Sequence, residues 1–258
     1  MSIQHKFFNT NFGRGLQTNS AILDTTPYLP EVMIVGTFNP NGPNANFADF
    51  FYGRNFFWPA FKDLFFHNAI VSTSRRMPPN GNPQAILDPS IQEIINYCIN
   101  LKLTFADLVV EVLHNGNPFY QVLQNDNVIF NGTEYNLIQD GLKGGIGGLQ
   151  QLNAIGQVNW NTQSIINYLS ENPQIETIYF TRRPTGIWAT EWNLIINHPS
   201  VQGRYATNLF TPSAAGAPVH RSMIRLLNHW IHNNNPNFGT LDHLWLAQHG
   251  VTPNNFRV

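Results

Sequence analysis

Residues 32 to 43 read Val-Met-Ile-Val-Gly-Thr-Phe-Asn-Pro-Asn-Gly-Pro, and residues 50 to 58 read Phe-Phe-Tyr-Gly-Arg-Asn-Phe-Phe-Trp. The short apolar run at 32–38 predicts a buried strand, and the Asn-Pro-Asn-Gly-Pro segment ends it. Ligands of open α/β sheets bind at the carboxyl ends of strands, so Asn39 occupies a place where functional residues are expected. Aromatic rings close behind an amide suit a flat, hydrogen-bonding ligand such as a nucleobase.

Three further apolar runs predict strands, and apolar residues at helical spacing predict helices between them. The expected strands are 101–112, 175–181 and 205–210, and the expected helices are 59–67, 91–99, 162–169 and a last one after Pro218. Strands separated by helices are typical of a parallel sheet that is covered on both faces. We therefore expect an α/β fold with three layers, α/β/α, around a central, mainly parallel sheet of four strands.

Length and composition predict a single domain spanning residues 1–258. The chain has 258 residues, of which 42% are hydrophobic, and such a chain can bury a large core. The first 30 residues are polar and rich in Asn and Thr, and we interpret 1–30 as an N-terminal extension lying over the surface of the domain.

The charge of the chain limits how it can bind nucleic acid. Charged residues make up 11% of the sequence, against roughly a quarter in typical soluble proteins, and the formal net charge is -1. A chain of this charge has no general attraction for phosphate, so any contact with DNA would depend on local basic groups. The candidates are Arg75 with Arg76, Arg182 with Arg183, and Arg221 with Arg225.

Several classes of site and location are not expected. Cys98 is the single cysteine, which excludes an intramolecular disulfide and any cluster of cysteine ligands. His229 and His232 have no carboxylate or cysteine near them in sequence, so no metal site is predicted. The sequence has no signal-peptide pattern and no apolar run approaching ~18 residues, so we expect an intracellular protein that is neither secreted nor membrane-bound. That means the cytoplasm in a bacterium or the nucleus in a eukaryote.

The segment from residue 36 to residue 58 resembles the first motif of the uracil-DNA glycosylase superfamily. In that motif a strand ending in Gly leads to a loop with a water-positioning Asn or Asp, and then to an aromatic stretch with an Asn and a Trp. The resemblance is closest to the mismatch-specific, hypoxanthine-acting and uncharacterised branches. The matching residues are Gly36, Asn39, Pro40, Tyr52, Gly53, Arg54, Asn55, Phe57 and Trp58.

A second segment, at residues 205–218, resembles the Pro-Ser loop with which the same superfamily presses into the minor groove of DNA. In efficient uracil-removing members a His precedes Pro-Ser and stabilises the departing base, whereas this chain has Thr211 there. His198-Pro199-Ser200 reproduces the triplet but follows a helical pattern, so we interpret it as the end of a helix. Each match alone is compatible with ordinary α/β architecture, and the presence of both favours the superfamily.

The resemblance implies a monofunctional DNA N-glycosylase of base excision repair. Such a hydrolase flips a deaminated or damaged base (uracil, hypoxanthine or mismatched thymine) out of DNA and cleaves its bond to the sugar with a positioned water. We expect it to act as a monomer without a cofactor. The implied residues are Asn39 or Asn55 for catalysis, Phe38, Tyr52, Asp107 and Thr211 for base binding, and Arg54, Pro212, Ser213, Ala214, Gly216, His220 and Arg221 for DNA binding.

Two departures from the family pattern leave other interpretations open. Asp107 falls near the position that reads the base edge, where uracil-specific members carry Asn, and an ionised Asp only accepts hydrogen bonds. Asp107 could equally be a solvent-facing residue at a strand end. Together with Thr211, it supports the alternative of a non-catalytic protein of the same fold that binds nucleic acid or a nucleobase. The low charge and high Asn content are also compatible with a structural or interaction protein.

Overall fold

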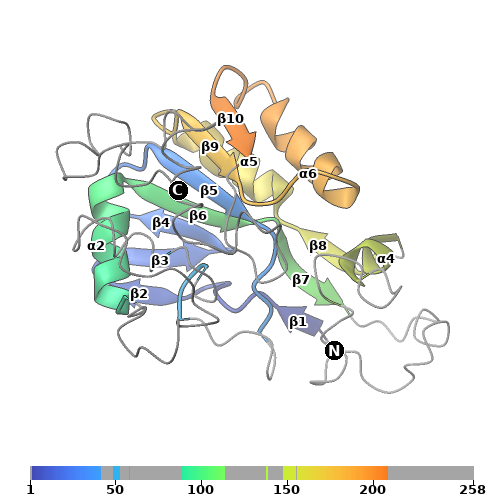
Figure 1. The fold of residues 1–258 in the computed structure, drawn as a ribbon, viewed down its shortest axis with the longest axis horizontal. Helices are drawn as coiled ribbons and strands as arrows, with labels where there is room; N and C mark the ends of the chain where they lie inside the picture. Colours follow the sequence, from blue (N-terminus) through green and yellow to red (C-terminus); the bar gives the residue numbers. More distant parts are fainter. Residues whose placement is uncertain are drawn as a thin grey trace, which may run out of the picture.

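The computed structural model describes residues 2–41, 49–52, 58, 89–113, 138, 148–154 and 156–208. This part of the chain forms a mixed α/β structure (Figure 1). Its helices are α2 (Ile91–Leu101), α4 (Gly148–Ala154), α5 (Thr162–Glu171) and α6 (Ile187–Ile196). Its strands are β1 (Ser2–Gln4), β2 (Asn11–Gly13), β3 (Leu16–Asn19), β4 (Ile22–Thr25), β5 (Val32–Gly36), β6 (Leu103–Asp107), β7 (Val109–Leu113), β8 (Val158–Trp160), β9 (Thr177–Phe180) and β10 (Tyr205–Asn208).

The main sheet has seven strands in the order β10-β9-β5-β6-β4-β3-β2. Strands β10, β9, β5 and β6 are parallel to one another, as expected, whereas β4, β3 and β2 continue the sheet in antiparallel fashion. The expectation of a four-stranded, mainly parallel sheet is therefore wrong: the sheet is mixed and larger. A second, antiparallel sheet has the order β1-β7-β8.

The additional strands come from the N-terminal segment, which is not a surface extension. Strand β1 pairs with β7, while β2, β3 and β4 form a meander at the edge of the main sheet. In β3 the residues alternate between buried and exposed, which is the pattern of a strand with one solvated face. Polar residues on the solvated face gave this segment the composition of a loop, which explains the wrong interpretation.

The apolar run at 101–112 forms two strands in different sheets. Strand β6 ends at Asp107 and β7 begins at Val109, so the chain leaves the main sheet at Leu108. There the Leu108 N–H donates to Gly36 O at 3.1 Å, and Leu108 O accepts from the Asn161 N–H at 2.7 Å. The side chain of Asp107 is consequently held at a corner between the two sheets.

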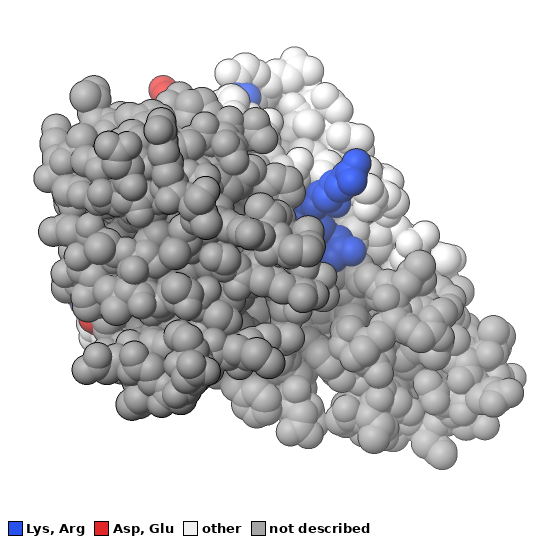
Figure 2. Space-filling model, in the orientation of Figure 1, with Lys and Arg blue, Asp and Glu red and all other residues white. Residues whose placement is uncertain are grey.

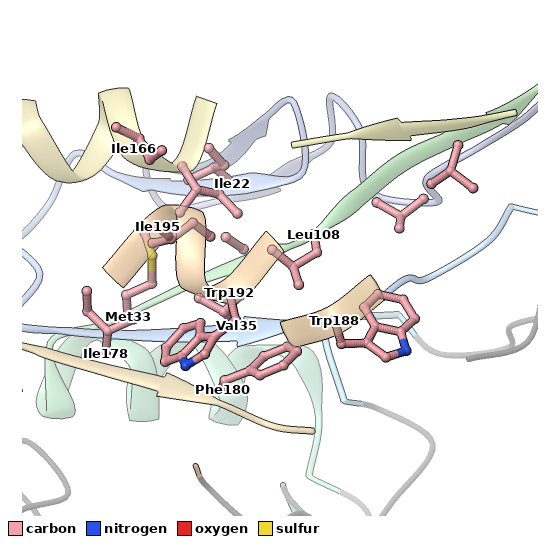
Figure 3. Packing of buried hydrophobic residues seen from close by; sticks show 14 of the residues in the cluster. Ile22, Met33, Val35, Leu108, Ile166, Ile178, Phe180, Trp188, Trp192 and Ile195 are labelled. Carbon is pink, nitrogen blue, oxygen red and sulfur yellow. The ribbon is translucent and has the colours of Figure 1, made fainter. Parts of the chain in front are cut away.

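The two faces of β5 are covered by different helices. Val32 and Ile34 pack in one buried cluster with residues of α2, such as Ile95. Met33 and Val35 point to the opposite face, where they join residues of α5 and α6 (Figure 3). Because successive side chains of a strand alternate in direction, one apolar strand contributes to both clusters.

Most of the expected elements within the described residues are present. Helix α2 begins where the sequence predicts, with Ser90 and Glu93 forming a capping box, and α5, β9 and β10 overlap their predicted ranges. The helices predicted at 59–67 and after Pro218 lie outside the described residues. Among the helices that are described, none has the length and apolar content required to cross a bilayer.

Candidate functional site

The carboxyl ends of β5 and β6 meet at one edge of the main sheet. The two strands are parallel neighbours, and Gly36, the last residue of β5, pairs in register with Asp107, the last residue of β6. Phe38 and Asn39 follow β5 in the adjoining loop and are both partly exposed. This edge therefore carries three of the candidate site residues, Phe38, Asn39 and Asp107, in the place where α/β sheets bind ligands.

Asp107 is buried and has two hydrogen-bond donors on one oxygen. Its Oδ2 accepts from Asn39 Nδ2 at 2.5 Å and from His5 Nε2 at 2.7 Å, and the residue is only 1% exposed. The interpretation of Asp107 as a solvent-facing residue at a strand end is therefore wrong. A buried carboxylate needs donors to offset the loss of water, and Asn39 and His5 provide them.

The contacts of His5 define its tautomer. The Phe7 N–H donates to His5 Nδ1 at 3.0 Å, so Nδ1 is an acceptor and the ring proton lies on Nε2, which donates to Asp107. The orientation of the ring is thus fixed at both nitrogens. The ring also packs between aromatic rings, with centroid distances of 5.8 Å to Phe7, 6.1 Å to Phe38 and 5.8 Å to Phe51.

The loop that carries Asn39 is tied to the N-terminal segment by backbone hydrogen bonds. The Lys6 N–H donates to Asn39 O at 2.7 Å, and the Asn41 N–H donates to Gln4 O at 2.9 Å. Between these bonds, His5 and Pro40 form an antiparallel bridge. The position of Asn39 is therefore set by the N-terminal segment, which was expected to lie over the surface of the domain.

Tyr52 lies at the same edge and bonds to the end of β9. Thr181 Oγ1 donates to Val35 O at 3.1 Å, so it accepts from the Tyr52 hydroxyl, which lies 3.0 Å away. The Tyr52 ring lies 5.9 Å from that of Phe105, centroid to centroid. Tyr52 has a φ of 60°, a value that is rare for a bulky residue and that occurs preferentially at functional sites.

Gly36 allows the side chains of this site to approach the backbone. A Cβ at residue 36 would lie 2.1 Å from Asp107 Oδ1 and 2.6 Å from the Tyr52 hydroxyl oxygen. Both distances are far below normal contact, so any other residue here would displace Asp107, Tyr52 or both. The Gly at the end of the apolar run is thus required by close packing.

Basic side chains follow β9 at this edge. The guanidinium of Arg182 lies 5.3 Å from the centroid of the Trp188 ring, and Asn208 Nδ2 donates to Arg182 O at 2.6 Å. Arg183, the next residue, is exposed. On the face seen in Figure 2, most of the described surface is uncharged and a small group of Lys and Arg side chains stands out.

The triplet at 198–200 has a local role. His198 follows the end of α6, and its Nδ1 lies 2.8 Å from Ser200 Oγ within the same turn, which agrees with its interpretation as a helix end.

Burial raises the pKa of the Cys98 thiol above its ordinary value, so the thiol is protonated and unsuited to act as a nucleophile. The described residues contain no cluster of His, Cys, Asp and Glu suited to a metal ion.

Of the residues implied by the resemblance, the structure places four and brings them to one edge: Phe38, Asn39, Tyr52 and Asp107. The remaining ones lie outside the described residues: Arg54, Asn55, Thr211, Pro212, Ser213, Ala214, Gly216, His220 and Arg221.

His5 and Thr181 were not among the residues predicted for this site. Ile3, His5 and Phe7 are buried while Gln4 between them is exposed, and this alternation was visible as a period of two in a segment interpreted as polar. Thr181 directly follows β9, so its place at a strand end was a usable signal.

No match to the chain was found among models of protein families, among curated proteins or among solved structures. The site must therefore be judged on its own geometry.

Replacing His5 by leucine should destabilise the fold. His5→Leu removes one of the two donors to the buried Asp107 Oδ2 and leaves the Phe7 N–H without its acceptor. Unsatisfied buried polar groups cost about 1–3 kcal/mol, so we expect a loss of that size in the free energy of unfolding, measured by urea denaturation. His198→Leu, whose contacts lie within one turn, should cost less; equal losses in the two variants would contradict this account of His5.

Proposed function

We propose that this protein is a DNA N-glycosylase that removes a deaminated or damaged base, such as uracil, hypoxanthine or mismatched thymine. One observation carries the proposal: the Asn39 amide is held against Asp107 at the carboxyl ends of two central parallel strands, where Tyr52 also converges on Gly36. These are the positions at which the superfamily resemblance puts the water-positioning and base-stacking residues.

Cleavage of a glycosidic bond requires a water directed at C1′ of the sugar. The water oxygen forms a bond to C1′, the bond from C1′ to the base nitrogen breaks, and the electron pair leaves with the base. A proton from the water passes to solvent or to the departing base. Asn39 carries an amide oxygen that accepts a hydrogen bond and can orient water, although an amide cannot remove a proton at neutral pH. The mechanism therefore depends on positioning and suits bases that leave readily.

The remaining roles follow from the same edge of the sheet. Tyr52 and Phe38 offer rings on which an extruded base can stack, because every base has an aromatic face. Arg182 and Arg183, which follow Thr181 after β9, are the basic residues proposed to contact backbone phosphate. The proposal keeps the loop at 211–218 as the segment that enters the minor groove, and it needs neither a metal nor a cofactor.

The proposal is tested with a panel of labelled oligonucleotides. Single-stranded and duplex DNA would carry uracil, hypoxanthine, a G·T mismatch or ethenocytosine, and abasic sites would be revealed by alkaline cleavage. We expect strand cleavage after alkali for at least one of these bases and none for undamaged DNA. If the folded protein gives no abasic product from any of them, the glycosylase proposal fails.

One observation favours a second candidate, a nucleic-acid or nucleobase binder without catalysis. Asp107, the carboxylate at this edge, is buried and already accepts two hydrogen bonds on Oδ2, so it is not available to activate water. Fluorescence anisotropy on the same oligonucleotides separates the two candidates. Binding that is selective for one base, without any abasic product, would establish the binder.

A further inference from the structure

We infer that Asp107 and His5 are positioning residues, and that together they set the orientation of the Asn39 amide. This inference rests on the proposed function, since it assigns the amide of Asn39 to the catalytic water. It also gives Asp107 a different role from the base-reading one implied by the family resemblance.

Neither Asp107 nor His5 is accessible to a substrate. Their side chains are 1% and 0% exposed, respectively, whereas Asn39 is partly exposed. Any influence of the buried pair on a reaction must therefore pass through a neighbour that reaches the surface. Asn39, which bonds directly to Asp107 Oδ2, is such a neighbour.

The carboxylate distinguishes the two ends of the amide. An amide presents a donor, Nδ2, and an acceptor, Oδ1, in nearly the same shape, whereas an ionised carboxylate only accepts. With Nδ2 toward Asp107 the contact is a charge-assisted hydrogen bond, and in the flipped orientation two acceptors would repel each other. Asp107 thus fixes which way Oδ1 of Asn39 faces, and Oδ1 is the atom that orients water in the proposed mechanism.

The carboxylate is itself held from two sides. His5 donates to Oδ2 from a ring whose other nitrogen is bonded to the Phe7 N–H. On the other side, Oδ1 lies over Gly36, at a place that any Cβ would fill. Since the Lys6 N–H also holds Asn39 O, the N-terminal segment fixes both the backbone and the side chain of Asn39.

A double-mutant cycle tests whether Asp107 acts through Asn39. Single-turnover excision and DNA affinity would be measured for the wild type, Asn39→Ala, Asp107→Asn and the double mutant. We expect Asp107→Asn to slow excision by ~10-fold or more with roughly unchanged affinity, and the double mutant to be no slower than Asn39→Ala. If the double mutant is slower by the product of the two single-mutant factors, Asp107 acts independently of Asn39 and the inference is overturned. A loss that is confined to the affinity for one base would overturn it as well.

Two comparisons guard against a purely structural effect. Asp24→Asn removes the same charge from strand β4 and should leave the excision rate unchanged. His5→Leu should slow excision, because it removes a donor that holds Asp107, whereas His5→Gln retains an N–H donor and an acceptor and should keep much of the wild-type rate, provided that both proteins fold. Equal rates in the two His5 variants would contradict a positioning role for that residue.

A second readout does not depend on activity. In the NMR spectrum of ¹⁵N-labelled protein, the Asn39 side-chain amide pair is identified by its absence in Asn39→Ala. We expect the resonances of this pair to change chemical shift in Asp107→Asn and in His5→Leu, but not in Asp24→Asn. An unmoved pair in Asp107→Asn overturns the inference. A displaced pair in a protein that excises no base supports the positioning contact and overturns the glycosylase function instead.

Discussion

Asn39→Ala is expected to lower the single-turnover rate of base excision by more than ~10-fold, equivalent to about 1.4 kcal/mol of activation free energy. The amide is held in one orientation by Asp107, so its loss removes an interaction with the water that matters in the transition state. Affinity for DNA should change little, because the amide is proposed to face the water and not the phosphates. Rapid-quench kinetics on the best substrate of the panel measures the rate.

The matched control is Asn41→Ala, two residues further along the same loop. Asn41 is exposed, and its backbone N–H donates to Gln4 O, a hydrogen bond that the variant retains. We expect a wild-type rate for Asn41→Ala. If Asn39→Ala also keeps the wild-type rate while Asn55→Ala loses it, the water-positioning role belongs to Asn55.

Gly36→Ala is expected to damage both stability and excision. The added methyl group would lie 2.1 Å from Asp107 Oδ1 and 2.6 Å from the Tyr52 hydroxyl oxygen, so at least one of these side chains must move. Overpacking of this kind costs about 1–3 kcal/mol, measurable by urea denaturation. We also expect a rate loss comparable to that of Asp107→Asn, because a displaced carboxylate no longer holds the Asn39 amide.

Two variants separate the causes of the Gly36→Ala effect. The double variant Gly36→Ala/Tyr52→Phe loses the contact between the added methyl group and the Tyr52 hydroxyl but keeps the closer contact with Asp107 Oδ1. Its excision rate should therefore remain low. Gly13→Ala strains a residue with a φ of 85° that has open space around it, so it should lower stability and leave the rate intact. A folded Gly36→Ala protein with the wild-type rate would show that the arrangement around Asp107 is not needed for excision.

The central parallel strands were predictable because their sequences are continuous apolar runs. Strands β5 and β9 are buried along their whole length, and helix α2 carries its own start signal at Ser90. The antiparallel strands β2 to β4 were not predictable in this way. They are short and partly polar, and only β4 pairs with a strand that is distant in sequence, β6.

The same distinction applies to the site. The position of Asn39 followed from a local pattern, an apolar run that ends at a turn. The contact between His5 and Asp107 joins residues separated by 102 positions, and no local pattern indicates such a partner. The change from one sheet to the other at Leu108 was not predictable either. An apolar run has the same pattern whether it stays in one sheet or passes into a second one.

Mass spectrometry of unheated, alkali-free reaction mixtures tests the central claim most directly. Each oligonucleotide of the panel would be incubated with wild-type protein and with Asn39→Ala under single-turnover conditions. The account predicts an intact abasic strand and an equal amount of free base for at least one substrate, with both products strongly reduced in Asn39→Ala. Unchanged strand masses for every substrate, or equal product from the two proteins, would contradict it.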